Sequence, residues 1–389
     1  IDPKYNNGPV VYVKDASQSP VAVSNLLNPE SKSEYVEMIE QEYVTLRENA
    51  SVKKTILLPL ADVQKKAFKI DWNNFSTDVP AFLGRKVLKN IKIEEILPYV
   101  DWKFFFHSWD LSAKFHNVSK IDNCEHCRAQ WLATYSDEDR ERAIEAAKLY
   151  DNACELLQML IDQKAEYVNA VFGLYAANSQ GDTIIVDGEE HFPMLRQQKK
   201  NEKDAYLCLS DFIAPLSSAK TDYIGAFAVT AGAGADELLR KYENEGDQYS
   251  ALLLKSLLDR LAEAATEWLH AKIRKEYWGY TADEDLTIAE MFAVKYRGIR
   301  PAVGYPSIPD QSVNFQLHKL LSSDEIGISL TENGVMYPNA SVSGLLFANP
   351  ESKYFAIGEI SEEQLIDYAK RKHVEPSYVR KFLLSNLSM

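Results

Sequence analysis

The segment Arg300-Pro301-Ala302-Val303-Gly304-Tyr305-Pro306 holds the most chemically specific group of residues in this 389-residue chain. Arg300 is a permanent cation whose planar donors match a carboxylate. The prolines fix φ and Gly304 lets another backbone approach closely, so the segment neither continues a helix nor suits a central strand. We expect a rigid loop of the kind that holds small molecules. The alternative is a stiff connection whose arginine points to solvent.

A glycine turn at residues 229–236 suggests a second possible chemistry. Gly232 and Gly234 follow an apolar run and precede a helical pattern over 236–242, as in a nucleotide-binding turn. The third glycine and the β-α alternation that should follow are missing from the sequence. A Rossmann-type, free-standing methyltransferase is therefore the alternative rather than the preferred interpretation.

Asp259 and Glu263 are four residues apart, so their carboxylates share one face of the helix that the apolar spacing predicts over 254–268. Like charges at this spacing repel each other and need compensation. The pair either lines a functional rim or belongs to a solvated face with Lys255 and Arg260 nearby.

The spacing of the cysteines argues against a metal centre. Cys124 and Cys127 form the only close pair, and a zinc site usually needs two such pairs. Cys154 and Cys208 are isolated, and we expect them to be small buried apolar groups. Four cysteines without a secretory signal predict a reducing, cytoplasmic location.

Composition excludes several classes of partner. The net charge of −14 argues against binding to nucleic acid or to an anionic membrane surface. No apolar run reaches the length needed to span a bilayer.

Hydrophobic periodicity predicts a mixture of helices and strands without regular β-α alternation. This favours an α+β fold with an antiparallel sheet. Residues 49–98, broken by prolines and a glycine, are expected to be mostly irregular. The expected helices, besides 236–242 and 254–268, cover 21–27, 33–48, 143–161, 287–290 onward, 361–372 and 376 onward. The expected strands cover 9–13, 171–177, 183–187, 205–210 and 223–230.

Several blocks, in a fixed order, resemble one known family. The chain is similar to the activation domain of cobalamin-dependent methionine synthase over roughly residues 50 to 386. The blocks are Tyr99-Val-Asp-Trp102, His191-Phe-Pro-Met-Leu-Arg-Gln-Gln198, Asp222-Tyr-Ile-Gly-Ala-Phe-Ala-Val229, Asp259-Arg-Leu-Ala-Glu263, Tyr277-Trp-Gly-Tyr280, the segment 300–306, Ala340-Ser-Val-Ser-Gly344 and Ser352-Lys-Tyr-Phe355.

The resemblance implies a fold and a domain organisation. The fold is a curved antiparallel sheet clasped by helices. Residues 1–30 resemble the end of the preceding cobalamin-binding domain, 31–50 a linker helix, and 51–389 the activation domain. The alternative for residues 1–30 is an extra edge strand and helix of the main domain.

The resemblance also implies a ligand, S-adenosylmethionine. Arg300 would bind its carboxylate and Asp101 its ammonium, while Asp259 and Glu263 would lie on the rim. The family carries an acid shortly before its signature arginine, and the comparable residue here is Val294. Because of this difference from the family, a docking domain that has kept the fold but lost its ligand remains an alternative interpretation. The remaining ligand contacts implied by the resemblance are Ala302, Gly304, Tyr305, Tyr354 and Phe355.

The implied function is reductive reactivation within an enzyme that methylates homocysteine to methionine. The neighbouring domain would bind the cobalamin, and only a separate homocysteine module would bind zinc. Flavodoxin or a related reductase would deliver the electron. Methyl transfer needs positioning rather than an acid or a base, so no catalytic residue is expected. In this acid-rich chain, Lys103, Lys114 and Lys120 either form a docking patch for the reductase or are scattered and solvated.

Overall fold

The computed structural model describes residues 8–13, 19–29, 31–52, 56–121, 124–163, 166–202 and 205–388. Contacts divide the chain into two compact units, Ile1–Ile56 and Leu57–Met389. The domain boundaries predicted at residues 30 and 50 stay predictions.

The first unit contains two packed helices, α1 (Ser19–Leu27) and α2 (Lys32–Val52). Both helices were predicted. The strand predicted over residues 9–13 is wrong, because these residues form no strand. The backbone amide of Tyr12 instead donates to the Tyr43 hydroxyl at 2.7 Å. An apolar run becomes a strand only beside a partner strand. Residues 14–18, between this segment and α1, lie outside the described residues.

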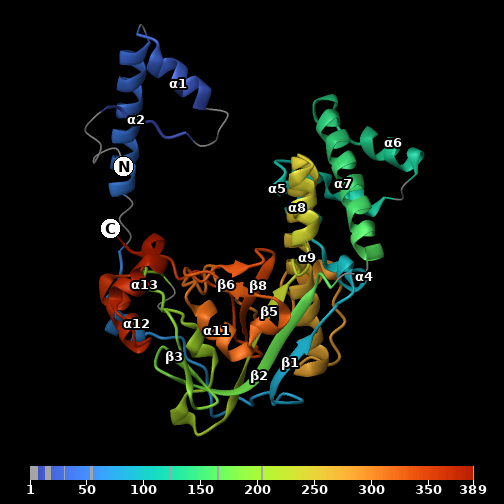
Figure 1. Ribbon diagram of the computed structural model, residues 1–389. Helices are drawn as coiled ribbons and strands as arrows, with labels where there is room; N and C mark the ends of the chain where they lie inside the picture. The colour runs from blue at the N-terminus through green and yellow to red at the C-terminus, as the bar shows by residue number, and fades with distance from the viewer. Residues whose placement is uncertain are drawn as a thin grey trace. The chain divides into compact units, whose positions relative to one another are not determined.

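The second unit is built on a six-stranded antiparallel sheet, in which β2 is the longest strand (Figure 1). One edge of β2 pairs with β5, which pairs in turn with β8. The other edge pairs first with β1 and then with β3, which continues to β4. The strands are β1 (Gly84–Leu88), β2 (Asn169–Gln180), β3 (Thr183–Val186), β4 (Glu190–Pro193), β5 (Asp222–Thr230) and β8 (Ser341–Leu346), and a separate two-stranded sheet contains β6 (Ser329–Leu330) and β7 (Met336–Tyr337).

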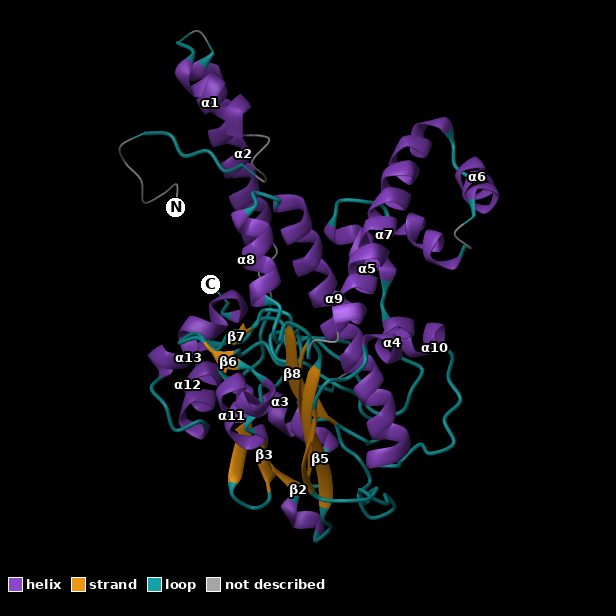
Figure 2. Ribbon diagram, turned by 45° about the vertical axis from the view of Figure 1, so that its right-hand side comes forward, coloured by secondary structure: helices purple, strands orange, loops and turns teal. Residues whose placement is uncertain are grey.

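Helices cover both faces of this sheet (Figure 2). Ala170 and Phe172 of β2 pack with α9, whereas Val171 and Tyr175 belong to the core that includes α11. Both faces are buried, which explains why β2 and β5 are apolar nearly throughout. The helices are α3 (Leu60–Lys65), α4 (Ile93–Ile96), α5 (Trp102–Ser108), α6 (Glu125–Ala133), α7 (Asp137–Gln163), α8 (Asp236–Asn244), α9 (Gln248–Lys272), α10 (Ile288–Phe292), α11 (Val313–Leu321), α12 (Glu362–Arg371) and α13 (Pro376–Leu383).

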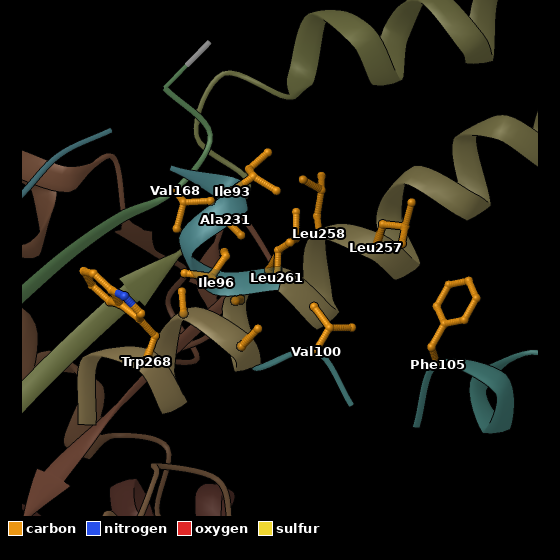
Figure 3. Packing of buried hydrophobic residues seen from close by; sticks show 14 of the residues in the cluster. Ile93, Ile96, Val100, Phe105, Val168, Ala231, Leu257, Leu258, Leu261 and Trp268 are labelled. Carbon is orange, nitrogen blue, oxygen red and sulfur yellow. The ribbon is translucent and has the colours of Figure 1, made fainter. Parts of the chain in front are cut away.

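Helix α9 is the main support of the site described below. Its apolar face packs beside α4, where Leu261 lies near Ile96 (Figure 3). Burial of this leucine-rich face leaves the opposite stripe of α9 free to carry polar groups. The α+β class with an antiparallel sheet and clasping helices is confirmed.

Two local predictions fail. Residues 205–210 form no strand but enter a short 3₁₀ turn at Leu209–Phe212, because the Asp211 carboxylate accepts the Cys208 amide hydrogen at 2.9 Å. Residues 49–98 contain α3, α4 and the edge strand β1, which the prediction of a mostly irregular segment missed. Two of the five residues of β1, Arg85 and Lys86, are charged, as is usual for an edge strand, so its sequence signal is weak.

None of the helices in the described part of the chain combines the length and the apolar character that crossing a bilayer requires.

Candidate ligand-binding site

The segment around Arg300 lies along the free edge of β8. The Leu345 amide donates to the Pro301 carbonyl at 3.1 Å, and the Val303 amide donates to the Ser343 carbonyl at 2.9 Å. This close approach requires Gly344, because a Cβ there would lie 2.3 Å from the Pro301 oxygen. The segment is a loop, as expected, and backbone hydrogen bonds attach it to β8.

The loop turns sharply at Gly304, whose φ is +87°. Its amide donates to the Ile308 carbonyl at 2.8 Å, and the Ile308 amide donates to the Tyr305 carbonyl at 2.9 Å. A left-handed φ favours glycine, so the turn and the fixed position of Tyr305 depend on this residue.

A cavity of about 690 Å³ opens between this loop, α9, the start of α5 and the segment 354–356. Aromatic side chains are the largest group in its wall and charged groups are fewer, which is the usual character of a small-molecule site. The lining residues are Tyr99, Asp101, Phe104, Arg260, Glu263, Glu267, Met291, Phe292, Val294, Tyr296, Arg300, Pro301, Ala302, Tyr305, Pro306, Ser307, Tyr354, Phe355 and Ala356.

Most of the residues singled out from the sequence meet in this cavity, and two do not. Gly304 lines a neighbouring hollow of about 770 Å³ instead. Asp259 is exposed and lines neither space. The residues brought together are Asp101, Glu263, Arg300, Ala302, Tyr305, Tyr354 and Phe355.

Arg300 points into the fold rather than to solvent, and its side chain is 9% exposed. It forms an ion pair with Glu267 of α9, and its backbone amide donates to the Tyr354 hydroxyl at 2.9 Å. Its buried Nε has no hydrogen-bond partner among the described residues. Burial by itself opposes the charge, but the nearby Glu267 carboxylate raises the pKa of Arg300 above its usual value. The residue is therefore a fixed cation with an unused donor.

Asp101 has a structural role beside its place in the cavity wall. It is the N-cap of α5, where its Oδ1 accepts the Lys103 amide hydrogen at 2.9 Å. Such a cap satisfies a backbone donor that the helix leaves unpaired.

Three tyrosine hydroxyls complete the polar wall. The Tyr305 hydroxyl donates to Glu263 Oε1 at 2.8 Å, and the Tyr296 and Tyr354 hydroxyls lie 3.2 Å apart. Burial and the Glu263 charge raise the pKa of Tyr305 to about 12, so it remains a neutral donor near pH 7.

His270 of α9 and Arg274 of the π-helical turn that follows it (Ile273–Tyr277) lie behind Tyr296 of this wall. His270 is buried, meets the Tyr296 ring edge-on at 4.8 Å, and has no hydrogen-bond partner for either ring nitrogen among the described residues. Burial and the charges of Arg274 and Arg300 hold its pKa well below the usual value. Arg274 in turn lies 4.4 Å from the centre of the Tyr296 ring and binds Glu284. A neutral imidazole therefore packs behind Tyr296, outside the cavity lining and near two cations.

Sequence reasoning missed part of the wall. Glu267 shares the polar stripe of α9 with Glu263, so its position could have been inferred from the helical period. Tyr296 and Phe292 gave no such signal, because they reach the cavity only through the path of the chain after α10.

Val294 also lines the cavity and adopts a left-handed backbone conformation, with φ of +55°. The amides of Val294 and Lys295 donate to the Met291 and Glu290 carbonyls at 2.9 and 3.1 Å. This pattern ends α10 with a Schellman motif, in which glycine or asparagine is the usual left-handed residue. A β-branched residue there is strained.

The glycine turn after β5 does not belong to a nucleotide-binding β-α-β unit, since every strand pairing in the described six-stranded sheet is antiparallel. Gly232 is needed for packing, because a Cβ there would lie 2.5 Å from Pro338. Among the described residues no cluster of three or more metal-binding side chains was found.

The fold and this cavity are those of an α+β domain that binds a small molecule, and comparison with known proteins agrees. Residues 92–373 match the family model described as the vitamin B12 dependent methionine synthase, activation domain. The chain belongs to this family, as the sequence resemblance predicted.

A solved structure described as the MetH reactivation domain bound to AdoHcy is similar over most of the chain. The two share 35% sequence identity with a TM-score of 0.77, and the match covers 86% of this chain and all of that one.

Proposed function

We propose that this chain binds S-adenosylmethionine in the cavity beside Arg300 and presents its methyl group for reductive reactivation of methionine synthase. The similar structure contains AdoHcy, the product left when S-adenosylmethionine gives up its methyl group. The observation that carries the proposal is the position of Arg300, a buried cation in the cavity wall whose Nε has no partner among the described residues. A carboxylate is the acceptor that this group fits best.

The charges around the cavity suit a ligand with an excess of positive charge. Three carboxylates line it, those of Asp101, Glu263 and Glu267, against two guanidinium groups, those of Arg260 and Arg300. S-adenosylmethionine carries an ammonium and a sulfonium against one carboxylate, so its net charge opposes that of the wall. Asp101 would bind the ammonium, and the sulfonium would lie near Glu263.

The nucleoside would occupy the aromatic part of the wall. Tyr354 and Phe355 offer ring faces, and Tyr305 offers a hydroxyl that is held by Glu263. Ala302 contributes a small side chain and its backbone beside them, while Gly304 would act by shaping the turn.

In the complete enzyme, the cobalamin of the neighbouring domain would supply the nucleophile once flavodoxin or a related reductase has delivered an electron. This chain's residues would bind the sulfonium and orient its methyl group. No proton moves in that transfer, so a general acid or base is unnecessary. We place the activity in the cytoplasm, within an enzyme that methylates homocysteine and whose zinc belongs to a separate module.

Titration calorimetry of this chain with S-adenosylmethionine tests the proposal. Wild type should bind, and Arg300→Ala should weaken binding at least tenfold, because a charge-assisted hydrogen bond contributes about 1.5–3 kcal/mol. Arg297→Ala is the matched control, since Arg297 pairs with Asp78 and does not line the cavity.

Two outcomes would count against the proposal. Binding by Arg300→Ala as tight as by wild type would move the ligand elsewhere. No binding by wild type would favour a docking domain that has kept the fold and lost its ligand, the alternative that Val294 keeps open.

A further inference from the structure

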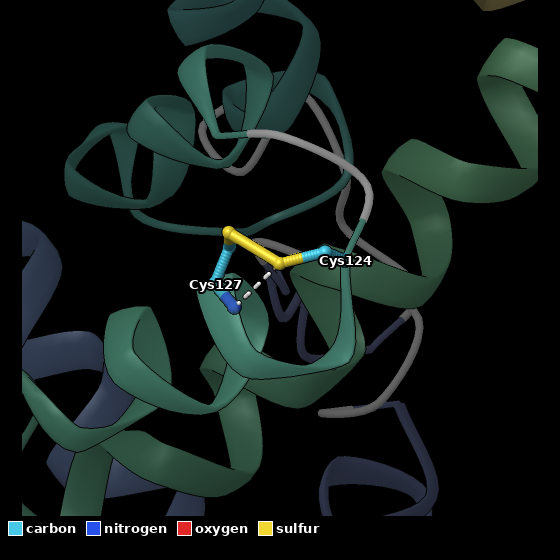
Figure 4. The surroundings of a disulfide bond; sticks show 2 residues. All are labelled: Cys124 and Cys127. Carbon is cyan, nitrogen blue, oxygen red and sulfur yellow. Dashed lines mark hydrogen bonds between the residues drawn. A yellow bond between two sulfur atoms is a disulfide. The ribbon is translucent and has the colours of Figure 1, made fainter.

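Cys124 and Cys127 are joined by a disulfide at the first turn of α6. Cys124 is the N-cap and Cys127 lies three residues later, so both side chains face the same side of the helix with their Cα atoms 5.3 Å apart. The Cys127 amide donates to the Cys124 sulfur at 3.0 Å (Figure 4). The helix itself therefore holds the two sulfurs together, in a geometry that suits a disulfide.

This pair differs from the other two cysteines in its access to solvent. Cys124 is exposed together with Glu125 and His126, and Cys127 is half-buried. Cys208 is fully buried, as predicted, and burial raises the pKa of its thiol to about 12. Cys154 is half-buried rather than buried, and burial raises its pKa as well. A small thiol reagent in solution therefore reaches the pair most easily.

The position of the pair also favours the reactive form of a thiol. The N-terminus of a helix stabilises a thiolate through its partial positive charge and its free amides. The Cys127 amide provides such a contact for the Cys124 sulfur, while Glu125 in the same turn acts in the opposite direction. The Arg128 guanidinium nearby is engaged by Asp151.

We propose that Cys124 and Cys127 form a redox-active site that alternates between a dithiol and a disulfide by exchange with low-molecular-weight thiols. This goes beyond ligand binding at the cavity and does not involve it. It does rest on the cytoplasmic location proposed above. In that compartment a lasting disulfide is unusual, whereas a transient or sensing one is the common case.

The exchange needs only a small disulfide as oxidant. One cysteine thiolate attacks a sulfur of the small disulfide, which forms a mixed disulfide and releases one small thiolate. The second cysteine thiolate then attacks the first cysteine sulfur and releases the other small thiolate. Two electrons pass from the cysteines to the small disulfide, and the two released thiolates take up the two cysteine protons.

The redox state should change the order of α6. This nine-residue helix is too short to be stable alone. Trp131 anchors its later part as a buried residue, and Arg128 anchors its middle through Asp151. The first turn depends on the cross-link, so reduction should loosen that turn and leave the rest of the fold intact.

The test is to equilibrate the whole chain with mixtures of reduced and oxidised glutathione, quench with acid, alkylate the free thiols and measure the intact mass. Cys124 and Cys127 should oxidise together and reversibly within the range of these mixtures. Cys154→Ser should leave this titration unchanged. Cys127→Ser should give only a mixed disulfide at Cys124.

Several results would overturn the proposal. A pair that stays oxidised in dithiothreitol under native conditions is a structural cross-link. A pair that stays reduced in excess oxidised glutathione has no redox role, and stoichiometric zinc uptake by the reduced thiols would assign them to a metal. Hydrogen exchange of α6 is the second measurement, and equal exchange rates in the two redox states would contradict the predicted loosening.

Discussion

Arg196 and Arg300 are both buried and both paired with acids, yet their donors are used in different ways. Arg196 makes five side-chain hydrogen bonds, to Asp182, Asp211 and the Tyr206 carbonyl. Arg300 pairs with Glu267 alone and keeps its Nε without a partner among the described residues. An arginine has five N–H donors, so Arg196 is fully satisfied by the fold and Arg300 is not.

This difference fits a structural role for Arg196 and the ligand-binding role that we propose for Arg300. The Arg196 backbone amide also donates to Gln364 at 2.7 Å, which connects the segment after β4 to α12. Both arginines lie in blocks that resemble the same family, so sequence similarity does not distinguish their roles. What sets Arg300 apart is an unused donor together with a place in the cavity wall, since Arg297 also keeps an Nε without a partner among the described residues but lies outside that wall.

The largest expected effect is on stability. Arg196→Met should lower the free energy of unfolding by about 3–5 kcal/mol, because Asp182 and Asp211 would remain buried without a counter-charge. Arg300→Met should cost much less, since its partner Glu267 is 20% exposed and can be hydrated. Urea unfolding of both variants is the measurement. Equal losses would remove the contrast between the two arginines.

Asp101 combines a structural role and a proposed ligand-binding role in one residue. Its Oδ1 caps α5, and the residue also lines the cavity. Asp101→Asn should keep the cap, because asparagine caps helices as well as aspartate does. The change should weaken S-adenosylmethionine binding about tenfold or more through the lost charge–charge contact. An analogue without the amino group should bind both forms equally in calorimetry.

The control for this experiment is Asp259→Asn, which removes an acid that lies outside the cavity wall. If both ligands lose the same affinity with Asp101→Asn, then Asp101 is only a helix cap.

A smaller effect is expected at Val294, whose side chain lines the cavity while its backbone is strained. Val294→Asn should raise the free energy of unfolding by about 1 kcal/mol, because asparagine tolerates the left-handed region better than valine does. Val294→Ala keeps an ordinary Cβ at the same φ and should gain less. Thermal unfolding compares the three proteins, and a gain from alanine as large as that from asparagine would assign the effect to side-chain contacts.

The smallest effect concerns the proposed reductase-docking lysines. All three lysines are exposed, but Lys114 also pairs with Asp139 at 2.6 Å. Lys103→Glu in the full-length enzyme should therefore slow flavodoxin-driven reactivation a few-fold at low salt, and more than Lys114→Glu does. The defect should shrink as salt screens the charges, while S-adenosylmethionine binding should be unchanged. Normal reactivation at low salt would place the docking surface elsewhere.

The sequence by itself determined the elements that depend on local interactions. The periodic apolar residues of α7 and α9 predicted those helices, and the capping pattern at Thr287 predicted the start of α10. The prolines and the glycine of residues 300–306 predicted a rigid loop. These signals lie within a few residues of the feature that they specify, so no knowledge of distant contacts is needed.

Only the tertiary structure decided how these elements meet. The pairing of residues 299–303 with the edge of β8, the ion pair between Arg300 and Glu267, and the approach of Tyr296 to Tyr354 join segments that lie 33 to 58 residues apart. Residues 205–210 have the composition of a strand, but Asp211 and Arg196 take up the Cys208 amide and the Tyr206 carbonyl. A polar group is available for a ligand only if the fold gives it no other partner. Such partners lie far away in the sequence, and they reach the group only when the sheet and its helices have packed.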